Sequence, residues 1–311
     1  MNRTTANSFD QPAAGAVAYG IAPPGYRLPE ATRVGTVRLQ VADLARSLDW
    51  YQRVLGLRVL ERAERLAVLG AAEGSSPLVE LRELPGAAPV PRRGRLGLYH
   101  FAVLLPDRRA LGSFLRHLSD IGERAGMSDH LVSEAIYLSD PDGLGIEVYA
   151  DRPRSEWRVE DRQLAMTTEP LDVDSLLQAA GGEPWSGMPA GTAVGHVHLF
   201  VGDLERAAEF YHAGLGLDKV VWSYPGALFL SAGGYHHHLG TNTWAVGAVP
   251  AGAGDARLLE WELLVPTPGD AARALESLDR AGAQVERVGE GGLARDPWGT
   301  AVRVRAVRRP G

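Results

Sequence analysis

Residue types that bind transition metals recur at close spacing between residues 129 and 149. His130 is followed by Tyr137, by the turn Asp140-Pro141-Asp142-Gly143 and by Glu147, and another histidine, His100, precedes them. Histidine nitrogens and carboxylate oxygens are ligands for such metals, and two histidines with one carboxylate suit non-haem Fe(II) with open positions. The segment therefore predicts a metal site.

Composition narrows the ligand types and the partners. The chain has 311 residues, of which 45% are hydrophobic and 23% charged, as in globular proteins of about two domains. Because it contains no cysteine, a metal must be held by His, Asp, Glu or Tyr. The net charge of -6 gives no basic patch for nucleic acid. No signal-like start or bilayer-spanning apolar stretch occurs, so we expect a cytoplasmic protein that binds neither nucleic acid nor membrane.

An internal repeat indicates which elements must position the candidate ligands. Residues 41–51 match residues 201–211 position for position, and each copy predicts an alternating strand followed by an amphipathic helix. A fainter pair, 99–121 and 259–281, keeps the same offset of 160 residues. The chain therefore contains four βαβββ modules, near residues 34–84, 97–150, 194–245 and 258–307.

These modules predict an α+β fold of two curled-sheet domains. The expected divisions are an N-terminal tail (1–33), a first domain with modules one and two (34–150), a connector (151–193), and a second domain with modules three and four (194–311). A connector of this length leaves open which modules pack against each other.

The spacing from His130 to Glu147 resembles the extradiol (ring-cleavage) dioxygenase signature of the vicinal oxygen chelate superfamily, which also contains glyoxalases and bleomycin resistance proteins. Ser128 alone departs from the signature. Further segments, above all Tyr235-His236-His237-His238, resemble the bacillus-type two-domain catechol 2,3-dioxygenase family over residues 34–306. The resemblance implies the vicinal oxygen chelate fold, Fe(II) as cofactor, O2 as co-substrate, and cleavage of a catechol-like aromatic compound.

In that superfamily, paired modules curl around a cavity and carry ligands at the start of each first strand and on each last strand. The first-strand positions of modules one to four are Thr36, His100, His196 and Glu260. The last-strand positions align as Glu80, Glu147, His238 and Arg303.

Neither pairing within a predicted domain, module one with two or module three with four, gives a convincing metal site. Modules one and two offer one histidine with two carboxylates, and modules three and four place the guanidinium of Arg303 beside the metal. Modules two and three instead offer His100, Glu147, His196 and His238, which include two histidines and one carboxylate. This cross pairing would leave modules one and four as a structural half without a metal. Modules two and three could pair within one chain or between the two subunits of the homodimer that we expect.

The resemblance also implies roles for residues beside the metal. His130 would transfer protons, Tyr137 would donate a hydrogen bond near a substrate oxygen, and His198 would orient ligands or substrate. His236 and Phe200 would contact the substrate. Because strand residues alternate between faces, His237 is predicted to point away from the cavity.

Two other functions of the same fold stay open. One is a metalloenzyme that uses Mn, Ni or Zn, such as a glyoxalase-like isomerase or a resistance enzyme, and the other is an antibiotic-binding protein without catalysis. The signature around His130 and Tyr137 favours the dioxygenase, because isomerases and binding proteins have no need of it. Thr36 stands where module one would need a histidine ligand, so the alternative of a binding protein without catalysis remains.

Overall fold

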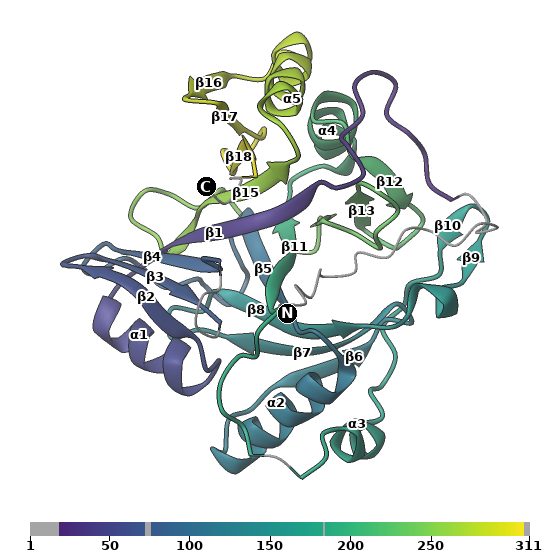
Figure 1. Ribbon diagram of the computed structural model, residues 1–311. Coiled ribbons are helices and arrows are strands. Elements are labelled where there is room, and N and C mark those ends of the chain that lie inside the picture. The colour runs from purple at the N-terminus through teal and green to yellow at the C-terminus, as the bar shows by residue number, and fades with distance from the viewer. Residues whose placement is uncertain (1–18, 72–75, 183, 308–311) are drawn as a thin grey trace, which may run out of the picture.

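The computed structural model describes residues 19–71, 76–182 and 184–307 (Figure 1). Residues 1–18 of the predicted tail lie outside the described residues. Module one contains β1 (Arg33–Val41), α1 (Leu44–Arg53), β2 (Arg58–Ala63), β3 (Leu66–Gly70) and β4 (Val79–Glu83). Module two contains β5 (Gly97–Leu104), α2 (Arg108–Asp120), β6 (Gly126–Asp129), β7 (Ser133–Ser139) and β8 (Gly145–Asp151).

The second half repeats this order after a connector with little regular structure. The connector carries η1 (Arg154–Glu156), β9 (Val159–Glu160), β10 (Gln163–Leu164) and α3 (Val173–Ala179). Module three contains β11 (Ala193–Phe200), α4 (Leu204–Ala208), η2 (Glu209–Gly214), β12 (Asp218–Val221), β13 (Ala227–Ser231) and β14 (Leu239–Asn242). Module four contains β15 (Arg257–Val265), α5 (Pro268–Arg280), β16 (Val285–Val288), β17 (Gly291–Arg295) and β18 (Ala301–Ala306). The α+β fold of four βαβββ modules is thus confirmed.

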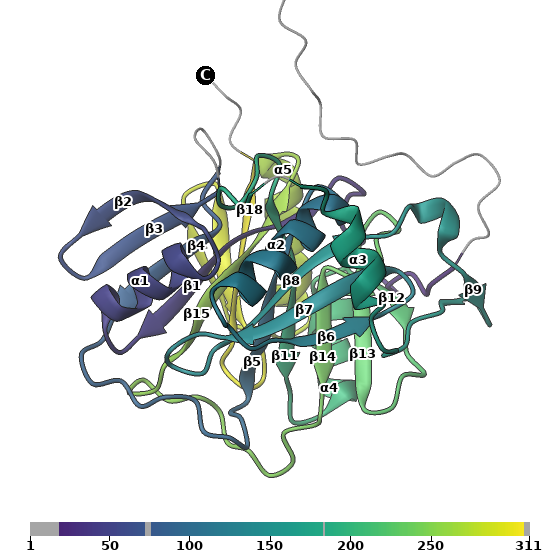
Figure 2. The ribbon, with the colours of Figure 1, turned by 90° about the horizontal axis from the view of Figure 1, so that it is seen from below.

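Each module turns from its first strand into a helix at a capping side chain. Asp43, Asp107 and Asp203 accept hydrogen bonds from backbone N–H groups three residues further on, and Thr267 with Asp270 forms a capping box on α5. Seen from below, α1 lies over β2 to β4, and α2 with α3 lies over β6 to β8 (Figure 2). The helices thus cover one face of each sheet and leave the other face for polar side chains.

Strand pairing crosses the predicted domain boundaries. One eight-stranded sheet has the order β12-β13-β14-β11-β5-β8-β7-β6, and the other has the order β16-β17-β18-β15-β1-β4-β3-β2. Modules two and three therefore share one sheet, and modules one and four share the other. The predicted units 34–150 and 194–311 do not correspond to the sheets, because the connector lets β11 return beside β5. Since both sheets form within one chain, the cross pairing needs no second subunit, and the dimer stays a prediction.

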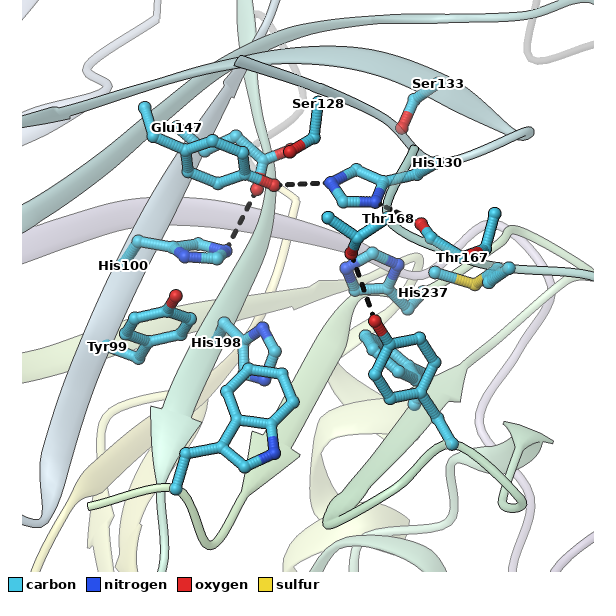
Figure 3. Close-up of a pocket in the computed structure, with 15 residues that line it drawn as sticks. Tyr99, His100, Ser128, His130, Ser133, Glu147, Thr167, Thr168, His198 and His237 are labelled. Atoms are coloured by element: carbon cyan, nitrogen blue, oxygen red, sulfur yellow. Dashed lines mark hydrogen bonds and ion pairs between the residues drawn. The ribbon is translucent and has the colours of Figure 1, made fainter. Parts of the chain in front are cut away.

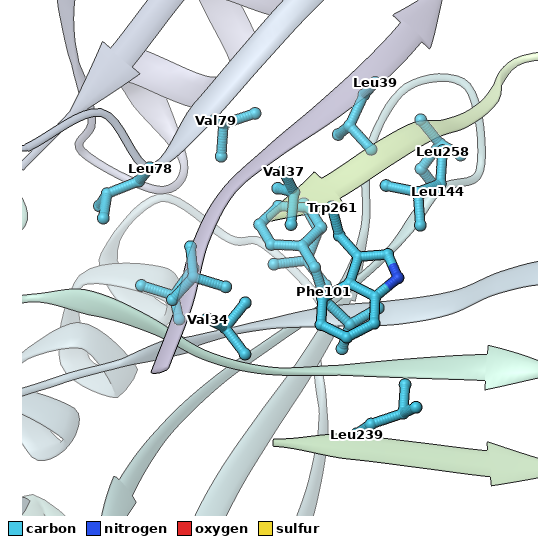
Figure 4. Packing of buried hydrophobic residues seen from close by; sticks show 14 of the residues in the cluster. Val34, Val37, Leu39, Leu78, Val79, Phe101, Leu144, Leu239, Leu258 and Trp261 are labelled. Atoms are coloured by element: carbon cyan, nitrogen blue, oxygen red, sulfur yellow. The ribbon is translucent and has the colours of Figure 1, made fainter. Parts of the chain in front are cut away.

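The two sheets meet over a common apolar core. Trp261, Phe101 and Val37 are fully buried there and come from the first strands β15, β5 and β1 (Figure 4). The four first strands therefore lie at the centre of the molecule, where burial of apolar surface favours folding.

A buried ion network fills the concave face of the sheet made by modules one and four. Arg38 lies within 3.0 Å of Glu80, 2.6 Å of Glu260 and 2.9 Å of Glu262. Burial alone would lower the pKa of Arg38, but these carboxylates hold it above its ordinary value. A guanidinium thus occupies the centre of this sheet, and no group of metal-ligating residues is found there among the described residues. That this half holds no metal stays a prediction.

We expect Arg38→Met to destabilise the protein by about 2 kcal/mol at pH 7, because three carboxylates lose a charged hydrogen bond at once. Each of these carboxylates keeps a second arginine partner, which limits the effect. Chemical denaturation measures the change in the free energy of unfolding. Arg82→Met is the matched control, since Arg82 contacts Glu80 at 2.6 Å from a side chain that is 53% exposed. Exposed pairs contribute about 0 to 1 kcal/mol. Equal effects of the two substitutions would contradict a special role for Arg38.

Candidate metal centre

Three neighbouring strands bring His100, His196 and Glu147 together. β5 pairs antiparallel with β11, so that Ala102 faces His196, and β5 pairs parallel with β8, so that Ala102 also faces Glu147. The small side chain of Ala102 therefore lies between two of the predicted ligands, and His100 lies two residues away along β5. The register of these strands alone places the three side chains on one face of the sheet.

The three side chains are buried and in contact. Nε2 of His100 lies 3.0 Å from Oε2 of Glu147, and Nε2 of His196 lies 3.2 Å from the same oxygen. Each residue is at most 5% exposed, and their ligand atoms all lie within 4.8 Å of one another. They form the group of possible metal ligands found among the described residues.

Electrostatics favours the protonation states that bind a metal. Burial alone would raise the pKa of Glu147, but the imidazoles of His196 and His100 hold it well below its ordinary value. Burial lowers the pKa of His196 to about 4, against the opposing attraction of Glu147. At neutral pH this site therefore offers a carboxylate and a neutral His196 imidazole, the forms in which both residues coordinate metals.

The geometry of the site fits a bound divalent metal. Oε1 of Glu147 is buried and has no hydrogen-bond partner in the part of the chain that the structure describes, and Nε2 of His100 faces Oε2 of Glu147 without the geometry of a hydrogen bond. Two ligand atoms that are each about 2.1 Å from a metal, at right angles, lie about 3.0 Å apart. The separations of 3.0 and 3.2 Å match this arrangement. A metal would thus supply the missing partner of these buried atoms.

The structure does not bring His238, the fourth predicted ligand, to this group. His238 precedes β14, and its Nδ1 accepts a hydrogen bond from the backbone N–H of Ala232 at 3.2 Å. The position that matches Glu147 is Gly240. Glu147 faces Ala102, two residues after the ligand His100, and Gly240 likewise faces His198, two residues after the ligand His196. The predicted alignment was therefore wrong by two residues.

The number of residues between the first-strand and last-strand positions of a module also indicates Gly240. The first-strand and last-strand positions are separated by 44 residues in module one (36 to 80) and by 43 in module four (260 to 303). The same spacing from His196 leads to 239 or 240. A side chain at Gly240 would place Cβ 2.8 Å from Cγ of His198. Glycine thus leaves this fourth position to the imidazole of His198.

A pocket of about 200 Å³ opens on the metal group. His100, His130, Tyr137, Glu147, His198 and His237 are among the residues that line it (Figure 3). Met166, Thr167 and Thr168 of the connector also line the pocket, opposite the strands. Two of the predicted metal ligands, His100 and Glu147, therefore line one cavity with the predicted proton-transfer and orienting residues, and the connector forms part of its wall.

His130 and Tyr137 form a hydrogen-bonded pair in this pocket. Nε2 of His130 lies 2.6 Å from Oη of Tyr137, and Nδ1 lies 2.6 Å from the carbonyl oxygen of Thr167. Because a carbonyl only accepts, Nδ1 carries the proton of a neutral His130, and Tyr137 donates to Nε2. Burial, and then the charge of Glu147, raise the pKa of Tyr137 well above its ordinary value. Tyr137 therefore keeps its proton at neutral pH.

His237 lines the pocket, contrary to the prediction that it points away. Its ring centroid lies 4.0 Å from that of His196, and burial lowers its pKa well below the ordinary value. The expected alternation fails because β14 begins only at Leu239, so residues 235–238 are not in a strand. His237 is therefore a pocket residue that the sequence pattern assigned to the wrong face.

His236 lies behind the pocket rather than in it. Its Nδ1 lies 2.7 Å from Nδ1 of His237, and its Nε2 lies 2.9 Å from Oδ1 of Asp151. His236 thus links His237 to a carboxylate that is 28% exposed. Since His236 does not line the pocket, its contact with substrate stays a prediction.

Aromatic residues that the sequence did not single out complete the walls. Tyr99, Tyr224 and Trp244 line the pocket, and Oη of Tyr224 lies 3.0 Å from Oγ1 of Thr168. Phe200, which was predicted to contact substrate, stacks beside Tyr99 with ring centroids 4.7 Å apart and lines a neighbouring groove instead. At the register shift between β11 and β5, Tyr99 is the extra residue of β5, and its ring contacts both His198 and Phe200, with centroids 5.2 and 4.7 Å away.

Comparisons with known proteins agree with this geometry. The family model of the glyoxalase/bleomycin resistance protein/dioxygenase superfamily matches residues 33–148 and 193–304. The chain is 44% identical to a catechol-2,3-dioxygenase of Bacillus subtilis (strain 168) over 272 residues, which cover 86% of this chain and 95% of that protein.

Solved structures with the same fold are much less similar in sequence. A putative dioxygenase from Bacillus subtilis superposes with a TM-score of 0.62 at 15% identity and covers 92% of this chain and 87% of that one. Glyoxalase I from Zea mays superposes with a TM-score of 0.51 at 20% identity, with 88% and 92% covered. These two structures support the fold alone. Among the described residues, no helix is long and apolar enough to cross a membrane.

Proposed function

The chain belongs to the glyoxalase/bleomycin resistance protein/dioxygenase superfamily, and we propose that it is a non-haem Fe(II) extradiol dioxygenase that opens the ring of a catechol with O2. The observation that carries the proposal is the convergence of His100, Glu147 and His196, of which His100 and Glu147 line a pocket that also holds the His130–Tyr137 pair. The extradiol dioxygenase activity predicted from the sequence agrees with the relative that is 44% identical over most of this chain.

The donor set favours Fe(II) among the metals of this fold. Two imidazoles and one carboxylate on one face leave several coordination positions open, which is the arrangement of non-haem Fe(II) oxygenases. When bound, the metal would bring the two catechol oxygens and dioxygen together and pass electron density between them.

The protein's own residues would hold and move the protons of the substrate. Tyr137 keeps its proton and presents Oη beside Glu147 and the metal group. His130, held at Nδ1 by Thr167, leaves Nε2 to exchange a proton with Tyr137. His237 faces the same cavity as a neutral imidazole, which can accept a proton. The pocket thus has proton-transfer groups beside the place where a catechol would bind.

The remaining walls would hold the ring and exclude water. Tyr99, Phe229 and Trp244 supply aromatic surface to the pocket. Aromatic side chains favour offset or edge-to-face contacts with a planar ring. A cavity of about 200 Å³ holds a single aromatic ring closely, so the aromatic compound would be positioned beside the metal group.

The decisive experiment is to load the purified protein with Fe(II) without air, add catechol, and then follow oxygen uptake together with the yellow ring-opened product. We expect both signals with Fe(II), and neither with Zn, Ni or Mn of equal occupancy. Binding of Fe(II) without any oxygen uptake, over a range of substituted catechols, would refute the dioxygenase. Isomerase activity with Ni or Zn would favour the glyoxalase-like alternative.

A further inference from the structure

A second, larger hollow adjoins the pocket. It has a volume of about 1020 Å³ and shares Tyr99, His100, Tyr137 and Trp244 with the pocket. Figure 3 shows Tyr99 next to His100, which is one of the candidate metal ligands. A molecule that occupies the pocket can therefore extend past these residues into the hollow, which we call the outer groove.

The inner wall of the outer groove is aromatic and closely packed. Phe200 lies against Tyr99, and the loop that precedes β5 passes close over it. Gly94 in this loop has φ +76°, and a Cβ there would lie 3.0 Å from the ring of Phe200. The loop thus holds its close approach to Phe200 through glycine, and the inner wall offers apolar surface next to the metal group.

Cations line the outer part of the groove. Arg92, Arg93 and Arg124 are exposed and line it, and Glu123 is the acidic residue beside them. None of the three arginines forms an ion pair within the described residues, whereas nearby Arg95 lies 3.4 Å from Asp255. Three unpaired guanidinium groups on a chain with a net charge of -6 mark this groove as a place that attracts anions.

We infer that the natural substrate is a catechol whose ring carries an extended substituent ending in a carboxylate. This inference rests on the proposed function. The ring with its two oxygens fills the pocket of about 200 Å³, the apolar part of the substituent lies along Tyr99, Phe200 and Trp244, and the carboxylate reaches the arginines. Guanidinium groups match the planar shape of a carboxylate.

The expected gain for an acidic substrate is modest, because these arginines are exposed. Single exposed ion pairs contribute little, and salt screens them. Three arginines acting together should favour an acidic over a neutral substituent about tenfold in kcat/KM at low ionic strength. The preference should decrease when salt is added.

The test compares 3-(3,4-dihydroxyphenyl)propionate with its methyl ester as substrates of the iron-loaded full-length protein. The unsubstituted protein should prefer the acid about tenfold in kcat/KM, and the variant Arg92→Gln/Arg93→Gln/Arg124→Gln should lose this preference. The variant Arg58→Gln/Arg62→Gln/Arg65→Gln is the matched control. It removes the same charge from exposed positions in module one, outside the outer groove, and should keep the preference.

Two other results have distinct meanings. Equal kcat/KM for acid and ester in the unsubstituted protein, or an equal loss of preference in both triple variants, would overturn the inference and leave the dioxygenase intact. Absence of ring opening with catechol, acid and ester alike would overturn the proposed function and this inference with it.

Discussion

Replacing His196 with alanine should abolish metal binding and ring opening together. His196 is 1% exposed and supplies one of the ligand atoms that lie within 4.8 Å of one another. Loss of a residue that merely supports a ligand costs about 10- to 100-fold in metal affinity, so loss of a ligand should cost more than about 100-fold. Iron content per chain after desalting, and oxygen uptake with catechol, measure the two effects.

Glu80→Gln is the matched control for this experiment. Glu80 would be a ligand if modules one and two shared the site, but it lies in the other sheet, where it contacts Arg38 and Arg82. We therefore expect the Glu80→Gln protein to keep its iron and its activity. Full iron content in His196→Ala, together with loss of iron in Glu80→Gln, would contradict a site made by modules two and three.

The sequence predicted the modules well because each is specified locally. An alternating strand, a capping aspartate and an apolar helix stripe recur around Asp43 and Asp203, and the structure has β1–α1 and β11–α4 at these places. Such short-range patterns need no knowledge of the rest of the chain. They therefore give the number and order of elements.

Apolar patterns did not predict which modules share a sheet, because all four first strands carry similar apolar residues. The polar faces differ, however. His100 and Glu147 complement His196, whereas Arg38 complements Glu260 and lies 2.6 Å from it. A buried charge without a partner is costly, so these polar sets favour the observed pairing over the sequential one. The chemically complete ligand set of modules two and three consequently indicated the pairing that hydrophobic periodicity left open.

Errors in the site are concentrated in the segment 235–238. Strand alternation does not hold in this turn, where φ and ψ vary from residue to residue, and Gly233 and Gly234 both have φ +62°. These glycines redirect the chain before β14 begins. As a result His237, and not His236 or His238, faces the pocket. Sequence patterns place residues within regular strands, but they do not place residues where the backbone leaves the strand.

His237→Asn should lower kcat about 100- to 10,000-fold while iron content stays unchanged, because loss of a positioned proton-transfer group has an effect of this size. His237 lines the cavity, and its Nδ1 is engaged with His236 at 2.7 Å, which leaves Nε2 without a hydrogen-bond partner among the described residues. Asparagine retains a polar group near the position of Nδ1, so the contact with His236 can persist. The substitution therefore removes the ring nitrogen that faces the pocket and little else. Steady-state oxygen consumption with saturating catechol measures the change in kcat.

His212→Asn provides the comparison for a buried histidine away from the pocket. Nδ1 of His212 lies 2.7 Å from the carbonyl oxygen of Leu217, and His212 is 7% exposed. We expect this variant to retain kcat within about twofold, since it preserves the hydrogen bond and touches no pocket residue. A kcat within threefold of the unsubstituted protein for His237→Asn, or an equal loss in both variants, would show that His237 does not transfer protons. A loss of kcat in His237→Asn alone, with iron content unchanged, would establish that His237 acts on the substrate, although strand alternation predicts that it points away.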